Sequence, residues 1–470
     1  MRHLTRREFL AIGFGGFALA AGGFFLSDPL FAPSGRASSH RLPIRATSPI
    51  LILAPHPDDE VLGSGGFWHQ MLGQGADVHV LVATCGDGFP ADADRVFLTA
   101  DPTPADYLRL GRRRMEESRT AVASLGLASG RIQFLGFPDS GTDHMFLHNW
   151  RRPYRSPFTR RSQDPYQGTL HPGIAYTGEN EFQAIYDAIR TIRPAILVLP
   201  HPNDVHPDHW AMAAFADAAI ERLRLEGHAF VSEMACLSYL VHWGDWPLPF
   251  GYHPEMPLLP PWEFQGLGTA WYREPLTAST VRAKAEAIRL YRTQMAVMSD
   301  RLEAFARRNE LFGLVPAHVV GPLDGRWSSV APDIEDPQGT LFADLLGSRS
   351  LVQDVRAATG GDRLLVRIAL RDLPAADLVL SSFLMAFSPG LPQGYMRRRI
   401  DIGPGIRPTM RDGDRLLPDP GIRWTFAGRV AELSLPLSTL RGARDLLYGI
   451  VLYRGRRRAG KTAFRVLRLA

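Results

Sequence analysis

A short apolar run that ends in a proline, a histidine and three consecutive acids constrains this chain more than any other feature. Residues 50–53 form the run, and Pro55, His56 and the acids at 58–60 follow it. A buried parallel strand that runs out into a polar loop has this pattern, and open α/β sheets keep their chemistry at that strand end. Packing alone would not select these polar residues, so we expect a functional site here.

The same loop offers donors for a metal ion. One imidazole and at least one carboxylate that reach a single point would suit a divalent metal, and nitrogen and oxygen donors fit zinc. The same donors admit iron or cobalt. A second carboxylate nearby, not itself bound to the ion, could take a proton from water.

A second polar cluster follows another apolar run. Residues 201–209 contain three histidines and two aspartates, directly after the run at 195–199. Several buried ionisable groups without a function would each cost desolvation free energy, so this cluster also indicates a site. A helix that begins near Pro207 would project Asp208 and His209 from its first turn, on the same sheet edge as His56.

The alternation of short apolar runs with helical patterns up to residue 241 predicts an α/β domain. We expect a Rossmann-like, mostly parallel sheet with helices on both faces. The predicted strands are 49–54, 77–84, 131–136, 195–200 and 234–241. The predicted helices include 107–125, 179–191 and 208–223. Residues 280–312 are strongly helical in pattern, and we expect them to close this domain, which we place at 44–315.

The pattern changes after residue 315. Alternating runs such as 363–370 and 446–453, with turns at 360–362 and 412–414, are typical of half-buried antiparallel strands. Residues 325–470 are therefore predicted to form a β-sandwich accessory domain. The aperiodic stretch 140–177 is long for a loop, and we expect it to influence substrate selectivity.

The first 43 residues have the pattern of an export segment. Arg6 and Arg7, followed by Phe9 and Leu10, resemble the twin-arginine translocation signal, and an apolar run continues to residue 26. This resemblance implies a periplasmic or other extracytoplasmic protein. The alternative is an uncleaved signal anchor in the inner membrane, because the run is about long enough to span a bilayer.

The net charge of +5 comes mainly from arginine. Arginine runs at 112–114, 397–399 and 456–458 lack interleaved aromatic residues, so we predict no binding of nucleic acid. Cys85 and Cys236 are too few for a disulfide framework or a zinc ribbon, and we interpret both as packed thiols.

The two polar blocks together resemble the PIG-L/LmbE-like family of zinc-dependent de-N-acetylases. The family pattern PHPDDE stands at 55–60, and its D-x-H-P-D-H block stands at 204–209. Weaker agreement lies at 114–126 and 134–140, so that the resemblance covers roughly 48–310. The C-terminal domain lies outside it.

The resemblance implies a role for individual residues. His56, Asp59 and His209 would bind zinc, and Asp58 would be the catalytic base. His206 would face the developing oxyanion as a charged hydrogen-bond partner and could act as the acid for the leaving amine, and Asp208 would hold the other nitrogen of the His206 ring. Asp139 would contact a sugar hydroxyl. We interpret Glu60 as an outer acid of the site, and Arg114 and Glu117 as an ion pair on one helix.

The function that the resemblance implies is metal-dependent hydrolysis of an N-acetyl group from an N-acetylglucosamine-type sugar, in a glycan, glycolipid or glycoside. Two alternatives remain open. The same metal site could hydrolyse another amide or a thiol conjugate. The protein could instead be a non-catalytic carbohydrate-binding protein of the envelope.

Overall fold

The structure of the protein is a computed structural model that describes residues 48–470, apart from 266, 336–350, 419–420 and 456. The predicted signal segment and linker at 1–43 lie outside the described residues. Among the helices that are described, none has the length and apolar character needed to cross a membrane.

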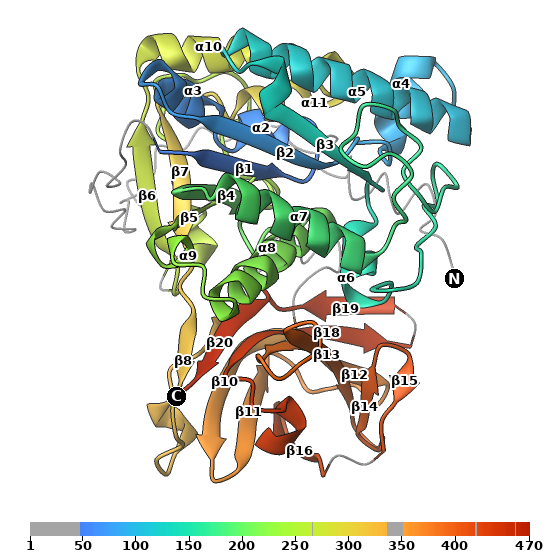
Figure 1. The fold of residues 1–470 in the computed structure, drawn as a ribbon, viewed down its shortest axis with the longest axis vertical. Helices are drawn as coiled ribbons and strands as arrows, with labels where there is room; N and C mark the ends of the chain where they lie inside the picture. The colour runs from blue at the N-terminus through green and yellow to red at the C-terminus, as the bar shows by residue number, and fades with distance from the viewer. Residues whose placement is uncertain (1–47, 266, 336–350, 419–420, 456) are drawn as a thin grey trace, which may run out of the picture.

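A mixed sheet forms the centre of the first region (Figure 1). Seven strands of the described chain join it, in the order β3-β2-β1-β4-β5-β7-β6. They are β1 (Ile50–Ala54), β2 (Val78–Thr84), β3 (Ile132–Phe137), β4 (Ile196–Pro200), β5 (Ala235–Tyr239), β6 (Ala270–Pro275) and β7 (Asn309–Leu314). The first five are parallel, whereas β7 runs antiparallel to β5 and β6. The five predicted strands are thus confirmed, and two strands are added at one edge.

Helices cover both faces of this sheet, as the apolar strands require. Leu51 and Leu53 of β1 pack on one face, and Ile50 and Ile52 pack on the other. The first face carries α6 (Thr142–Leu147), α7 (Gly178–Ile192) and α8 (Pro207–Leu225). The second face carries α2 (Asp59–Leu62), α3 (Gly65–Gly73), α5 (Pro104–Ser124), α10 (Ala278–Ile288) and α11 (Arg292–Glu303). The remaining helices are α4 (Pro90–Phe97), α9 (Phe230–Glu233) and the 3-10 turns η1 (Ser129–Arg131), η2 (Trp262–Phe264), η3 (Trp327–Ser329) and η4 (Leu437–Leu440).

The prediction that residues 280–312 are helical is wrong at its C-terminal end. The helical segment consists of α10 and α11, and the chain then enters β7. Five of the six β7 residues are buried, and a short buried run does not distinguish helix from strand by its period. Pairing with β6 decides the outcome. A buried ion pair of 2.8 Å between Glu310 of β7 and Lys284 of α10 ties the strand to the helix layer.

The C-terminal region is β structure, as predicted. Its described strands form a five-stranded sheet, β16-β17-β11-β10-β9, and an eight-stranded sheet, β15-β14-β13-β12-β18-β20-β8, with β19 beside β18. The bounds are β8 (His318–Val320), β9 (Ile334–Glu335), β10 (Val352–Gly360), β11 (Arg363–Leu370), β12 (Leu378–Phe387), β13 (Tyr395–Ile402), β14 (Thr409–Asp412), β15 (Arg415–Leu416), β16 (Arg423–Ala427), β17 (Val430–Pro436), β18 (Asp445–Arg454), β19 (Arg457–Lys461) and β20 (Arg465–Leu469). Residues from both sheets contribute to one apolar cluster. A sandwich arrangement and the domain boundaries stay predictions.

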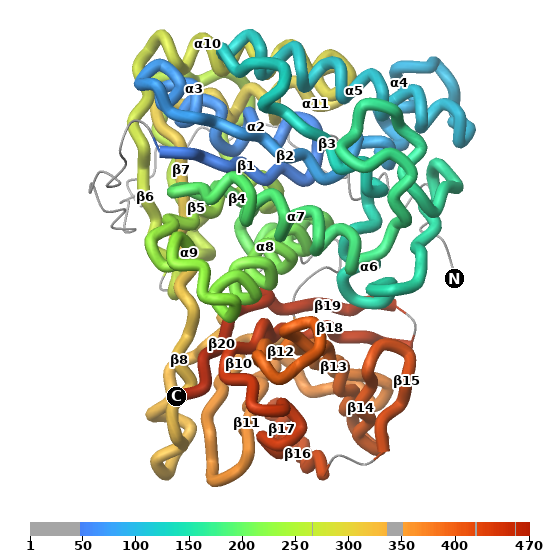
Figure 2. Tube along the Cα trace, in the orientation of Figure 1, coloured from blue at the N-terminus to red at the C-terminus, as the bar shows by residue number. Residues whose placement is uncertain are grey.

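The C-terminal region packs directly against α8 (Figure 2). The helix contacts β12, β18 and β20. Phe464, just before β20, stacks on Trp210 of α8 with ring centroids 5.6 Å apart and an interplanar angle of 9°. Phe146 of α6 meets the Phe464 ring edge-on at 5.1 Å. Since Trp210 follows His209, this interface lies next to the second predicted block.

We expect the Phe464→Ala substitution to lower the free energy of unfolding by about 3–5 kcal/mol, because a buried ring is lost and a cavity remains. Phe464 is 2% exposed. Urea unfolding monitored by tryptophan fluorescence measures the change. Leu373→Ala is the control, since Leu373 is 70% exposed and its loss should cost less than about 0.5 kcal/mol. Equal midpoints for the two variants would contradict this account of the interface.

Candidate metal and catalytic site

The end of β1 supplies the first half of the site. The strand stops at Ala54, and the chain then forms a tight loop before the short helix α2 begins at Asp59. His56, Asp58 and Asp59 are all buried, with at most 6% of each residue exposed. Three ionisable groups are therefore held out of water at one strand end, which requires partners for each of them.

Glu60 holds the backbone of this loop. Asp58 has a φ of 132°, a region that residues other than glycine rarely adopt. The backbone N–H of Asp58 donates to Glu60 Oε2 at 2.9 Å, while Tyr291 donates to Oε1 at 2.7 Å and Ser118 also donates to Oε1. Burial raises the pKa of Glu60. The interpretation of Glu60 as an outer acid of the site agrees with these contacts.

The loop after β4 supplies the second half. His206 precedes α8, which begins at Pro207 as predicted, and Asp208 and His209 lie in the first turn. Asp204 accepts hydrogen bonds from the backbone N–H groups of His206 at 2.9 Å and His242 at 3.0 Å. This carboxylate thereby joins the loop after β4 to the chain that leaves β5.

The two halves meet at the carboxylate of Asp59. Its Oδ2 atom lies 3.1 Å from Nδ1 of His56 and 3.1 Å from Nε2 of His209. Each of four residues offers one ligand atom within 4.8 Å of the others, and these are His56, Asp59, His209 and His242. The three predicted metal ligands therefore lie close together, although they are separated by up to 153 positions in the chain.

The surroundings of His209 also indicate a site for a cation. The residue is fully buried, yet among the described residues neither ring nitrogen makes a well-aligned hydrogen bond. Nδ1 lies 3.2 Å from Asp204 Oδ2, but this contact and the contact with Asp59 lack hydrogen-bond alignment. Burial opposes a charge on the imidazole, but the two carboxylates outweigh it and raise the pKa of His209 to about 9. Imidazole and carboxylate donors around an unsatisfied buried nitrogen fit a zinc-type cation.

Asp208 differs from its predicted contact. Its carboxylate lies against His56, with Oδ2 3.0 Å from Nε2, and does not hold the ring of His206. The backbone N–H of Ser140 donates to Oδ2 at 2.6 Å, and Thr142 donates to Oδ1 through its N–H and its hydroxyl at 3.1 and 2.9 Å. The position of Asp208 in the first turn of α8 aims its side chain at the loop after β3. Asp208 therefore connects the ends of three strands.

His206 is neutral near pH 7, which corrects the prediction of a charged imidazole. Burial and then the positive charge of His56 lower the pKa of His206 to about 4. A cation bound beside it would lower this pKa further. The backbone N–H of Asp208 donates to Nδ1 of His206 at 3.3 Å. Since Nδ1 accepts this hydrogen bond, the proton of the neutral ring lies on Nε2.

Asp58 lies beside the cluster and contacts a cation from α5. Its Oδ2 atom is 3.4 Å from Arg114 Nη2. Burial and the adjacent charge of Asp59 raise the pKa of Asp58, and Arg114 opposes them. Asp139, after β3, lies 3.5 Å from His56 and 4.0 Å from Arg114, and accepts the N–H of Gly88 at 3.0 Å. All of the predicted site residues therefore lie in or beside the same histidine and aspartate cluster.

Some site residues were missed or misassigned from the sequence. Arg114 does not pair with Glu117, because its buried guanidinium donates to Pro57 O and Gly86 O and Glu117 contacts Arg113. His242 was missed because it stands alone, outside both blocks. Its position three residues after a strand of the same sheet was the available signal. The buried His201 belongs to the first part of the second block but stacks on Trp271.

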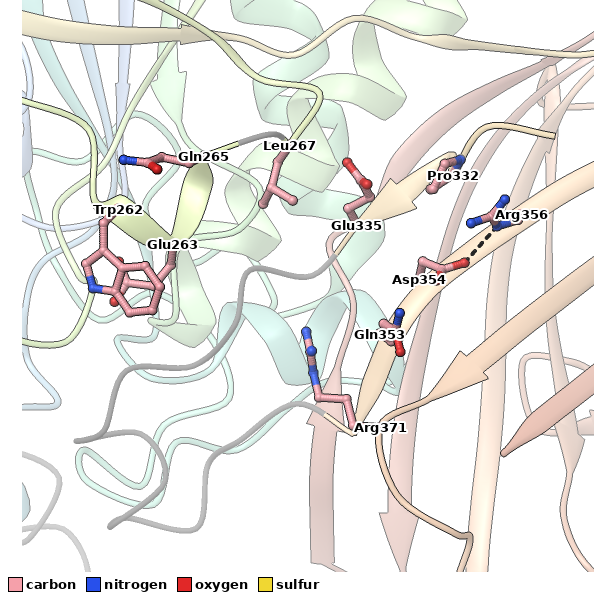
Figure 3. Close-up of a pocket in the computed structure, with 10 residues that line it drawn as sticks. All are labelled: Trp262, Glu263, Gln265, Leu267, Pro332, Glu335, Gln353, Asp354, Arg356 and Arg371. Carbon is pink, nitrogen blue, oxygen red and sulfur yellow. Dashed lines mark hydrogen bonds and ion pairs between the residues drawn. The ribbon is translucent and has the colours of Figure 1, made fainter. Parts of the chain in front are cut away.

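A cavity of about 470 Å³ lies elsewhere, between the loop that precedes β6 and the five-stranded sheet (Figure 3). Its lining includes Trp262 and Leu267 on one side and Glu335 and Arg356 on the other. None of the residues that border the histidine and aspartate cluster lines this cavity. The candidate site therefore lies at the strand ends, outside this cavity.

Comparison with known proteins supports the interpretation of the first region. Residues 51–220 match the family model described as PIG-L: GlcNAc-PI de-N-acetylase. A 1D-myo-inositol 2-acetamido-2-deoxy-alpha-D-glucopyranoside deacetylase from Rhodococcus jostii (strain RHA1) is 32% identical over 175 residues, which are 37% of this chain and 53% of that protein. The protein with the same name from Actinosynnema mirum is 28% identical over 267 residues, 53% of this chain and 82% of that protein.

A solved structure of N,N'-diacetylchitobiose deacetylase from Pyrococcus horikoshii is also similar, at 18% identity and a TM-score of 0.32 over 53% of this chain and 70% of that one. The chain spans about half the length of the first curated relatives that it matches. Both polar blocks fall inside the segment, residues 51–220, that matches this family model.

Proposed function

We propose that this site uses a divalent metal to hydrolyse the N-acetyl group of an N-acetylglucosamine-type amino sugar in a glycan, glycolipid or glycoside. Zinc is the metal that we propose. The observation that carries the proposal is the convergence of His56, Asp59 and His209 on one buried point, with Asp58 beside it. The family match over residues 51–220 and the deacetylase names of the relatives support the reaction class.

The residues of the cluster would hold the ion. His56, Asp59 and His209 supply two imidazoles and a carboxylate, and Asp204 behind His209 is the outer partner that such ligands commonly have. When bound, zinc supplies Lewis acidity that polarises a carbonyl and lowers the pKa of water to about 7.

Asp58 would transfer the proton, and His206 would stabilise the negative charge that develops. The carboxylate of Asp58 would accept a proton from the attacking water and return it to the amine nitrogen as the C–N bond breaks, and its raised pKa makes it a stronger base than an exposed aspartate. The Nε2–H group of neutral His206 would donate a hydrogen bond to the amide oxygen, which becomes negatively charged in the transition state. Asp208 fixes the orientation of His56 through its carboxylate and that of His206 through its backbone N–H. Asp139 would bind a sugar hydroxyl.

We also propose that the protein is exported, with the N-terminal segment either cleaved or kept as an anchor. The twin-arginine pattern at Arg6 and Arg7 and the apolar run after it support this proposal. An extracytoplasmic location suits a glycan or glycolipid substrate.

The Asp58→Asn substitution should reduce the release of acetate by about 10²–10⁴-fold, because the amide cannot accept the proton. Zinc-loaded protein is incubated with N-acetylglucosamine oligomers, and acetate is measured enzymatically. Asp77→Asn is the matched control, since the Asp77 side chain is 45% exposed and away from the cluster.

Unchanged activity in Asp58→Asn would exclude the proposed base. Glycan binding without acetate release or stoichiometric metal would favour the binding-protein alternative. Hydrolysis of only other amides or thiol conjugates would favour the second enzymatic alternative.

Metal binding should release at least one proton at pH 7.5. The pKa of His209 is raised to about 9, so its imidazole is protonated below that pH and must lose its proton to become a ligand. The affinity for zinc should therefore fall as the pH decreases from 9 to 7. Titration calorimetry in buffers of different ionisation enthalpy measures the protons released, and binding without proton release would contradict the assignment of His209.

A further inference from the structure

His242 joins the cluster from a third strand. It lies three residues after β5, which pairs in parallel with β4, so both chains leave the sheet at the same edge. Its ring centroid is 4.6 Å from that of His209 and 4.8 Å from that of His206. His242 lies outside residues 51–220 and therefore outside the family match.

The ligand atoms are close enough to share one ion. One atom from each of His56, Asp59, His209 and His242 lies within 4.8 Å of the other three. Ligands about 2.1 Å from a zinc ion are at most about 4.2 Å apart, so a small inward rotation of these side chains is enough to reach it. His242 is partly exposed, and the other three residues are buried.

A backbone hydrogen bond fixes the position of His242 and leaves its imidazole available to a ligand. The backbone N–H of His242 donates to Asp204 Oδ2 at 3.0 Å, and the same oxygen lies 3.2 Å from Nδ1 of His209. Over the part of the chain that is described, no hydrogen bond or ion pair engages the His242 imidazole, and its ring lies against the rings of His206 and His209. Within the described residues the buried ring nitrogens of His209 face Asp59 and Asp204 at 3.1 and 3.2 Å without a well-aligned hydrogen bond, which suits a cation between these residues.

We propose that His242 is a fourth protein ligand of the metal ion, so that three imidazoles and one carboxylate surround it. This inference rests on the proposed metal-dependent function, and it goes beyond the set of His56, Asp59 and His209 that the family resemblance implies. A fourth protein donor would hold the ion more tightly than a set of three, and the water that the proposed hydrolysis needs would then take a fifth coordination position.

The proposal is tested on the full-length protein loaded with one equivalent of zinc. X-ray absorption at the zinc edge identifies the ligands, and competition against a chelator of known affinity gives the dissociation constant. The wild type should show three imidazoles around the ion, and His242→Ala should show two. The zinc dissociation constant of His242→Ala should rise at least 10-fold, roughly the smallest effect that loss of even an outer partner of a ligand produces. His228→Ala is the control, since His228 lies beyond the C-terminal end of α8 and should leave both readouts unchanged.

Two imidazoles in the wild type would overturn the proposal, as would an unchanged dissociation constant in His242→Ala. The wild-type spectrum alone decides the question if the variant fails to fold. A wild type that releases acetate with zinc bound by two imidazoles would overturn only this inference. A wild type that binds no zinc would overturn the metal-dependent function together with it.

Discussion

The carboxylate of Asp59 lies between two imidazoles, and the site depends on this contact. One oxygen reaches His56 from the same loop and His209 from the first turn of α8, both at 3.1 Å. A buried carboxylate is costly without such partners. Burial raises the pKa of Asp59, but the charges of His209 and His56 outweigh it and lower the pKa well below the usual value. The end of β1 and the start of α8 are therefore held together by the groups of the candidate site.

Further buried acids extend this connection to the neighbouring strands. Asp208 joins His56 to the loop after β3, and Asp204 joins the start of α8 to the chain after β5. The C-terminal region also reaches this edge, because Arg458 of β19 donates to Asp143 at 2.7 Å and Arg465 of β20 donates to Asn203 at 3.3 Å. The interface with the C-terminal region thus supports the loops that carry the site.

Much of this arrangement could be predicted from the sequence, because buried parallel strands and the polar residues that follow them leave strong patterns. The ends of β1 and β4 were identified in this way, and with them His56, Asp58, Asp59 and His209. His242 was missed, since one histidine after an apolar run is a weak signal when no polar block surrounds it. The ring contact of Asp208 was wrong because it depends on the direction of a side chain, which the spacing of the block does not fix. The strand β7 was mistaken for helix because only its partner β6 reveals it.

In the proposed site, one metal ion would join the end of β1 to the start of α8. A crystal structure of the zinc-loaded protein, with anomalous data collected on both sides of the zinc edge, tests it most directly. We expect one strong anomalous peak about 2.0–2.2 Å from ligand atoms of His56, Asp59 and His209. A peak bound by other residues, or none at this cluster in a crystal that holds zinc elsewhere, would contradict it.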